Sequence, residues 1–214
     1  MKFLRYALFL LPALTAQAAT EVQVSDARNK AVSDIIVYLT PLEGQTYANN
    51  PETIEVGQKD LAFTPYLTVG QKGQAVSFQN DDDITHHIYS AVGDNKFSFK
   101  IKAGQTINKN DFSQSGVVPM GCNIHDWMGG YLLLVDTPLY NKTNKKGAAR
   151  FEQELSGKFK LTVWHPQLQT PDNQQEQIVE LAAGKTIAVK LNGKLAPIPE
   201  QVSDDDFDFL SDYE

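Results

Sequence analysis

The sequence is a succession of short segments with the alternation of β-strands, separated by turn residues, and this pattern restricts the fold more than any other feature. Residues 34–40 (DIIVYLT) are one such β-branched run, ended by Pro41. No window of normal helix length shows the 3.6-residue apolar period of an amphipathic helix. Short strands at this spacing are typical of β-sandwiches, so we expect an all-β protein. The expected strands are residues 21–25, 34–40, 66–69, 75–79, 86–91, 96–101, 116–120, 131–135, 149–154, 159–164, 177–181 and 186–191.

Residues 1–18 have the parts of an export signal in the right order. Lys2 and Arg5 give a positive start, an apolar stretch follows, and small residues around Ala16 and Ala18 resemble a cleavage site. The apolar stretch is shorter than the roughly 20 residues that a membrane-spanning helix needs. An N-terminal strand or a membrane anchor is the alternative. We expect a signal peptide, export to the periplasm, and a mature chain without a membrane span.

The formal net charge of the 214-residue chain is −7. This argues against a nucleic-acid partner, because such proteins need basic surface to neutralise phosphates. Residues 199–214 contain seven acidic side chains and no lysine or arginine, interrupted by Phe207, Phe209, Leu210 and Tyr213. Blocks of like charge are usually disordered and solvated. We expect a solubilising acidic tail, with docking on a basic partner as the alternative.

Residues 121–128 (GCNIHDWM) form the most informative motif. Cys122, His125 and Met128 are spaced C-x-x-H-x-x-M between two expected strands, so a short loop can direct a thiolate, an imidazole and a thioether towards one point. The chain contains one cysteine and four histidines. A lone cysteine is often only a small buried apolar residue. In an exported protein, however, an unpaired thiol requires an explanation.

A second imidazole is available from residues 81–90 (DDDITHHIYS), where His86 and His87 are adjacent. Consecutive side chains of a strand point to opposite faces, so both histidines cannot easily bind one metal from a regular strand. Two histidines, one cysteine and a weak axial methionine are the ligand set of a blue-copper electron-transfer site. The residues therefore predict such a site, with His86 or His87 as its second imidazole.

Residues 52–137 resemble the cupredoxin family of small blue-copper proteins, which includes plastocyanin, azurin and amicyanin. Residues 73–81 (GQAVSFQND) precede the histidine pair, and the cysteine motif follows it, as in the family. The short C-x-x-H-x-x-M spacing is most similar to amicyanin. The resemblance implies a Greek-key β-sandwich and one type 1 copper per chain, held by His86, Cys122, His125 and Met128.

The histidine pair departs from the family at one position. Cupredoxins usually have asparagine directly after the first histidine, where it braces the ligand loop, and this chain has His87 there. Alignment on the following apolar residues favours His86 as the ligand. We expect His87 to brace the ligand loop or to lie at the surface, with direct ligation as the alternative.

Zinc is the alternative metal for these residues. Structural zinc prefers four cysteine or histidine ligands and is poorly served by a thioether. Asp126 could replace Met128 in a zinc site, but it stands at the wrong offset for the cupredoxin pattern. The remaining histidine, His165, ends an expected strand before Pro166. We expect His165 to be a packed or hydrogen-bonded structural residue.

The flanks of the copper segment resemble two parts of a carboxypeptidase-regulatory-like β-sandwich. Residues 22–42 resemble its opening strands, and residues 147–163 resemble the strand pair that continues it. We therefore expect the cupredoxin unit to be inserted in a second small sandwich made of residues 20–45 and 138–198. Insertion is undemanding where the inserted termini lie close together. Two consecutive domains plus a short N-terminal extension are the alternative. Residues 44–51 and 138–147 are the expected connections at the boundaries.

These features predict an exported blue-copper protein that carries single electrons between a protein donor and a protein acceptor. By the resemblance, the ring edge of His125 is the electron exit, and the acidic tail could attract basic partners. A copper chaperone or sensor is the alternative, although the chain has three methionines and no Met- or His-rich tract. A copper enzyme would need a further open centre of histidines, so we expect no enzymatic activity.

Overall fold

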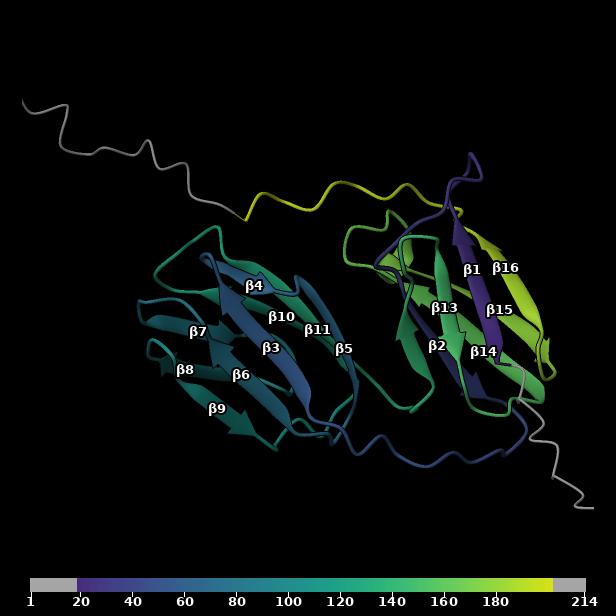
Figure 1. Cartoon of the computed structure of the whole chain (residues 1–214), viewed down its shortest axis with the longest axis horizontal. Coiled ribbons are helices and arrows are strands. Elements are labelled where there is room, and N and C mark those ends of the chain that lie inside the picture. The colour runs from purple at the N-terminus through teal and green to yellow at the C-terminus, as the bar shows by residue number, and fades with distance from the viewer. Residues whose placement is uncertain (1–18, 202–214) are drawn as a thin grey trace, which may run out of the picture.

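The computed structural model of the chain describes residues 19–201 (Figure 1). The expected export signal lies outside the described residues, as does most of the expected acidic tail, from residue 202 onward. The expectation of an all-β protein is confirmed, because the described chain has 16 strands and one 3₁₀ turn, Pro171–Asn173. Within these residues no helix has the length and apolar character needed to cross a membrane.

The strands form two units that lie side by side (Figure 1). The first contains the residues that the sequence analysis expects to bind copper, and it is called the copper unit below for that reason. It has a five-stranded sheet of order β5-β11-β10-β7-β8 and a four-stranded sheet of order β4-β3-β6-β9. The two sheets enclose one apolar core. The strands are β3 (Ile54–Lys59), β4 (Ala62–Thr64), β5 (Leu67–Gln71), β6 (Val76–Asn80), β7 (His86–Ser90), β8 (Phe97–Ile101), β9 (Thr106–Lys109), β10 (Gly116–Cys122) and β11 (Gly129–Val135).

The second, the flanking unit, is built from strands that precede and follow the copper unit in sequence. Its sheets have the orders β13-β1-β16 and β12-β2-β14-β15. The chain leaves this unit after β2 and returns to it at β12, so each sheet combines both flanks. The carboxypeptidase-regulatory-like resemblance stays a prediction. The strands are β1 (Thr20–Ser25), β2 (Ile36–Pro41), β12 (Tyr140–Lys142), β13 (Ala148–Phe151), β14 (Gly157–Trp164), β15 (Gln174–Leu181) and β16 (Thr186–Lys190).

Some strands differ from the sequence-based expectation. The strands β3, β4, β9 and β12 lie outside the expected ranges. Residues 138–147 were expected as a connection, but Tyr140–Lys142 pairs with β2 in an antiparallel ladder. β10 extends to Cys122 rather than ending near Met120. These segments are short or polar, and pairing with a neighbouring strand outweighs their weak local preference.

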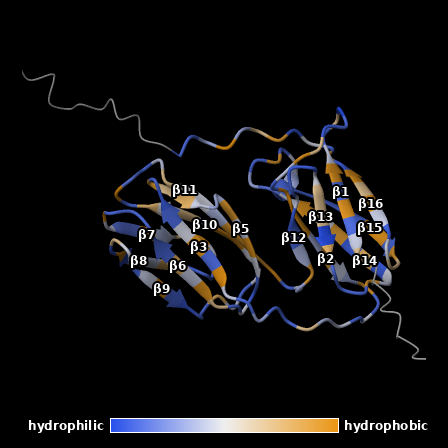
Figure 2. Cartoon of the chain, in the orientation of Figure 1, coloured by the Kyte–Doolittle hydropathy of each residue, from blue (hydrophilic) through white to orange (hydrophobic). Residues whose placement is uncertain are grey.

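In strands such as β1 and β7 the burial alternates along the strand, which Figure 2 shows as alternating colours along β1. The copper unit and the flanking unit each have their own core. A third apolar cluster joins them, with residues from both units: Ile36, Leu67, Leu133, Val135 and Trp164. The two units are therefore packed against each other through apolar side chains and not only linked by the chain.

Candidate metal centre

Two neighbouring strands bring the first histidine and the cysteine together. β7 alternates between the faces of its sheet, so His86 is buried while His87 is on the opposite face. Cys122 is the last residue of β10, and its backbone is paired with Ile88 of β7. His86 and Cys122 therefore point into the same core from adjacent strands, at the end of the sheet where the loop between β10 and β11 begins.

The ligand atoms of three residues converge in this place. His86, Cys122 and His125 each offer one ligand atom within 4.8 Å of the others, and all three residues are buried. The Sγ atom of Cys122 is 3.9 Å from Nδ1 of His86 and 3.7 Å from Nδ1 of His125. The two Nδ1 atoms are 3.2 Å apart. The sequence analysis predicted that these three residues share one site, and in the structure their ligand atoms lie close together.

The loop from residue 123 to residue 128 is held at both ends. Gly121 pairs with Gly129 across β10 and β11, which closes the loop, and the N–H of Met128 donates to the carbonyl of His125 over 3.0 Å. Met128 is 1% exposed and belongs to the same apolar cluster as Cys122. The side chain of Met128 is therefore part of the same buried core as the thiol.

Asp82, which the sequence analysis did not single out, fixes the orientation of His86. Its Oδ2 lies 2.8 Å from Nε2 of His86. An ionised carboxylate can only accept, so Nε2 is the donor of this contact, and in the neutral imidazole Nδ1 is then the nitrogen free to bind a metal. Such a carboxylate–histidine contact is the usual way to orient a metal-binding imidazole.

The carboxylate of Asp82 is itself held by a tight turn. The N–H of Asp60 donates to Oδ1 over 2.7 Å, and the N–H of Leu61 donates to Oδ2 over 3.2 Å. Both residues lie between β3 and β4 and have positive φ values, 53° and 57°. This left-handed conformation is uncommon for leucine, and here it directs two successive N–H groups at one anion. The turn therefore positions His86 through Asp82.

Burial affects the protonation of the second histidine. Desolvation is the main cause that lowers the pKa of His125, the neighbouring His86 lowers it further, and the charge of Asp82 opposes both. A lowered pKa keeps the imidazole neutral at pH 7, which is the form that binds metals. The indole of Trp127 lies beside this ring, with the centroids 5.4 Å apart.

His87 lies outside the group of converging ligand atoms. It forms hydrogen-bond contacts with Asn123 of the ligand loop and with Ser98 of β8. Its Nδ1 accepts from the side-chain amide of Asn123 over 3.2 Å, and its Nε2 is 2.9 Å from Oγ of Ser98. The N–H of Asn123 also donates to the carbonyl of His87 over 2.9 Å. His87 and Asn123, which directly follow His86 and Cys122, are thus hydrogen-bonded to each other. These bonds connect β7 to the ligand loop.

Two further residues considered from the sequence lie elsewhere. Asp126 is exposed and is not among the converging residues. His165 is 2% exposed and belongs to the flanking unit, where its Nδ1 accepts from the N–H of Gln167 over 3.1 Å. Burial lowers the pKa of His165 to about 4, so this histidine is neutral in the folded protein near pH 7.

The donor atoms fit a soft transition metal. A thiolate, two imidazoles and a buried thioether are the donors that copper accepts in both oxidation states. The sulfur and both Nδ1 atoms converge on one another, an arrangement that a bound cation would stabilise. Zinc fits less well, because no fourth histidine, cysteine or carboxylate joins the converging group among the described residues.

Comparisons with known proteins give limited similarity. No protein-family model matches the chain, and no curated protein matches it. Among solved structures, an oxidised amicyanin mutant is 16% identical, over 38% of this chain and 81% of its own, with a TM-score of 0.35. Amicyanin from Paracoccus versutus is 17% identical, over 39% of this chain and 82% of its own, with a TM-score of 0.36.

A copper-containing nitrite reductase from Thermus scotoductus SA-01 is 21% identical, over 45% of this chain, with a TM-score of 0.37. This chain covers only 25% of that enzyme. Similarities of this size do not establish a family or a function. The candidate assignment therefore depends on the side chains and distances of the site itself.

Proposed function

We propose that the chain is an exported type 1 copper protein of the cupredoxin kind that carries single electrons. The observation that supports this most directly is the convergence of Sγ of Cys122 with Nδ1 of His86 and Nδ1 of His125 in a buried site. Met128 is the proposed axial ligand. When bound, copper would supply one-electron chemistry by cycling between its two oxidation states.

The proposed contribution of the protein is to fix the positions of the candidate ligands. The backbone pairing of β7 with β10 fixes Cys122, Asp82 holds the ring of His86, and the turn from His125 to Met128 closes the loop. A site that keeps one geometry in both oxidation states exchanges electrons with little rearrangement. The hydrogen-bonded shell is therefore the feature that suits the site to electron transfer.

His125 is the proposed exit for the electron. It is 9% exposed, while the other imidazole, His86, is completely buried. Ile124, which precedes it, is 53% exposed, and the indole of Trp127 lies beside the ring. A partner that contacts this apolar surface would come close to the ring without displacing any ligand.

The proposal includes protein partners and a compartment. A donor and an acceptor protein would dock at the surface around His125, and residues 202–214 would attract partners with basic surfaces. Periplasmic export is proposed from residues 1–18 alone. We propose no enzymatic role. A copper enzyme would need a second copper centre, so the proposal requires that each chain binds a single copper.

The visible spectrum of the copper-loaded mature protein tests the site. We expect an intense thiolate-to-copper band, because Cys122 would be a direct ligand. Cys122→Ser and His86→Ala should each remove this band, whereas His87→Ala, a change at the adjacent histidine outside the converging group, should retain it. An unchanged band in Cys122→Ser would refute the proposal. Loss of the band in His87→Ala with retention in His86→Ala would show that His87, and not His86, is the copper ligand.

Electrochemistry separates electron transfer from copper handling. A carrier should show a reversible one-electron couple and fast self-exchange with the copper retained. A chaperone would instead transfer its copper to an apo-partner without a change of oxidation state, and this result would replace the proposed function with the alternative.

A further inference from the structure

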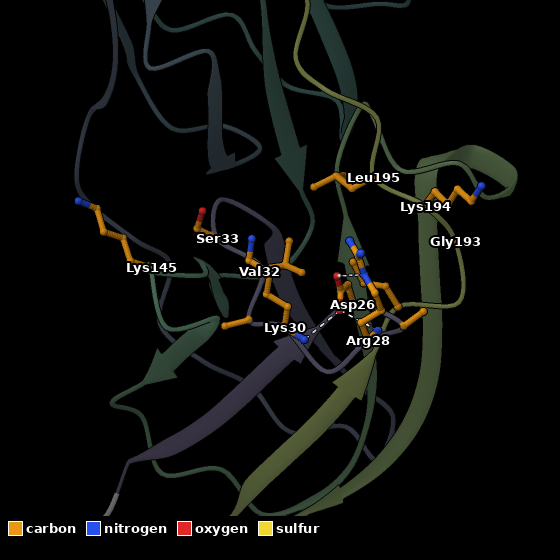
Figure 3. Close-up of a pocket in the computed structure, with 12 residues that line it drawn as sticks. Asp26, Arg28, Lys30, Val32, Ser33, Lys145, Gly193, Lys194 and Leu195 are labelled. Atoms are coloured by element: carbon orange, nitrogen blue, oxygen red, sulfur yellow. Dashed lines mark hydrogen bonds and ion pairs between the residues drawn. The ribbon is translucent and has the colours of Figure 1, made fainter.

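The end of the flanking unit has a basic depression, away from the candidate copper ligands. It has a volume of about 740 Å³ and is formed by the loop that follows β1, by Lys145, and by the segment that follows β16. Figure 3 shows Lys145 and Lys194 on opposite sides of it, with Asp26, Arg28 and Lys30 between them. We call the four cationic residues Arg28, Lys30, Lys145 and Lys194 the basic rim.

Most of the positive charge of the basic rim is not neutralised within the described chain. Lys30, Lys145 and Lys194 are exposed, and none has a carboxylate oxygen within ion-pair distance among the described residues. Arg28 has one such oxygen, at 3.9 Å in Asp26, and its side chain is 90% exposed. The rim therefore presents excess positive charge in a chain whose net charge is negative.

Asp26, the one acidic residue that lines the depression among the described residues, already accepts hydrogen bonds from its own loop. Oδ1 of Asp26 accepts from the N–H groups of Arg28 and Lys30 over 2.8 and 2.9 Å. The bond from the N–H of Lys30 is the main cause that lowers the pKa of Asp26. Asp26 therefore shapes the loop that carries two of the four cations, and its single negative charge offsets only one of the four positive charges of the rim.

The depression also has an apolar part. Leu195 is a large apolar residue with 37% of its surface exposed, and Val32 and Leu191 line the same space. Backbone bridges hold this region in place, because Ser25 pairs with Ala31, and Leu195 pairs with Leu168. A ligand that fits this surface carries carboxylates for the rim and an apolar or aromatic group for the floor.

Residues 202–214 of the same chain have that chemistry. Their sequence, VSDDDFDFLSDYE, places Phe207, Phe209 and Leu210 among six acidic side chains and contains no lysine or arginine. The described chain passes along the depression at Leu195 and ends at Gln201, whose Oε1 accepts from the N–H of Gly129 beside the ligand loop.

The length of this segment is sufficient for it to return to the depression. Leu195 and Gln201 are six residues apart, so they lie within about 22 Å of each other at full extension. The 13 residues from 202 to 214 can span up to about 45 Å. Because both parts belong to one chain, even weak contacts would be populated by the high effective concentration.

We infer that the basic rim is the docking site of the acidic segment 202–214 of the same chain. In the docked state the acidic side chains are held at the flanking unit. In the released state they begin next to Gly129 and the ligand loop, where they attract a basic partner. The rim and a basic partner thus compete for one segment. The docking itself does not require copper, so it stands or falls independently of the proposed function.

Cleavage of the full chain by chymotrypsin tests this, since the protease cuts after Phe207, Phe209 and Tyr213 and the shortened product is resolved by mass. At low salt we expect Lys30→Glu/Lys194→Glu to be cut about tenfold faster than the natural sequence, because several exposed ion pairs are lost together. Raising the salt concentration should accelerate cleavage of the natural sequence and have little effect on the variant.

The matched control is Lys96→Glu/Lys102→Glu, which reverses two exposed lysines of the copper unit and should be cut at the natural rate. A thermal melt checks that each variant is folded. Equal cleavage rates for the natural sequence and the rim variant would overturn the inference. Protection that grows with protein concentration would also overturn it, because the segment would then be docking on a second copy.

Discussion

At the scale of single residues, Asp82 is the side chain through which the protein controls the candidate site. It accepts from Nε2 of His86 and from the N–H groups of Asp60 and Leu61. An anionic acceptor behind an imidazole makes the other ring nitrogen a stronger donor, which favours Cu(II) over Cu(I). The three bonds also hold the ring in one orientation, so the residue affects both the affinity and the geometry of the site.

We therefore predict that Asp82→Asn weakens Cu(II) binding by about tenfold, the lower end of the range for such changes. If Cu(I) binding is unchanged, a tenfold loss raises the reduction potential by about 59 mV. Competition with a chelator and voltammetry measure the two quantities. Asp83→Asn, at an exposed neighbour, is the control for the loss of charge. A potential that shifts equally in both variants would contradict a specific role for Asp82.

The candidate ligand residues could be proposed from the sequence because they lie in two short motifs with few alternatives. A single cysteine and four histidines leave little choice of partner for each. Asp82 was not predictable in the same way, since it is one of three consecutive aspartates, and only the fold shows which one turns towards His86. Its position four residues before the histidine is the only signal that the sequence contains.

His165 gives a prediction about stability and pH. Its pKa is about 4 in the folded protein and about 6.5 when exposed. As the pH falls below 6.5, the unfolded chain binds a proton that the folded chain does not. The free energy of unfolding therefore decreases between pH 6.5 and pH 4, by up to ~3 kcal/mol for this residue.

His165→Asn removes the titrating group and keeps an oxygen that can accept from the N–H of Gln167. We expect the metal-free variant to lose about 2 kcal/mol less stability than the natural sequence when the pH is lowered from 7 to 4.5. Urea denaturation at the two pH values measures the difference. The same loss in both proteins would show that His165 is not the group responsible.

At the scale of secondary-structure elements, the pair β10–β11 decides where the ligand loop lies. The ladder ends at Gly121 and Gly129, directly beside Cys122 and Met128. Gly130 faces the opposite sheet, where an added Cβ would lie 2.8 Å from Cβ of Phe63 on β4. The two sheets therefore approach each other closely at the base of the loop, and glycine is what permits this approach.

We predict that Gly130→Ala destabilises the protein by about 1–3 kcal/mol, the usual range for overpacking a dense core. Gly129→Ala is the matched control, because an added Cβ there meets nothing within 4 Å, and its effect should stay within about 0.5 kcal/mol. Denaturation followed by circular dichroism gives both values. Equal stability of the two variants would show that the sheets can separate without cost.

The elements that the sequence did not predict are those with weak local signals. β3 contains Gly57 and exposed charged residues, and β9 is a four-residue edge strand with alternating exposure. β12 lies in a polar segment with two asparagines and several lysines. These strands form because a neighbour offers hydrogen-bonding partners. Segments with a strong local signal, such as β2 and β14, need no such help, and the expected bounds of both lie within two residues of the observed ones.

At the scale of the whole molecule, the contact between the two units couples the copper unit to the flanking unit. Leu133 and Val135 of β11 pack with Ile36 and Trp164 of the flanking unit. Polar contacts border this cluster, since Nζ of Lys142 donates to the carbonyl of Leu67 over 2.9 Å. β11 therefore contributes to two cores at once: Leu132 faces the core of the copper unit and Leu133 faces the flanking unit.

This arrangement predicts different outcomes for two adjacent leucines. Leu133→Ala removes apolar contact between the units. We expect one cooperative transition for the natural sequence and two for this variant, followed by the visible band for the copper unit and by Trp164 fluorescence for the flanking unit, with Trp127→Phe in both proteins so that Trp164 is the one indole. Leu132→Ala opens a cavity inside the copper unit only, at a cost of about 2–5 kcal/mol. It should lower the stability of that unit and leave the contact between the units intact. Coincident transitions in Leu133→Ala, at all denaturant concentrations, would show that the units are held together by their polar contacts and chain connections instead.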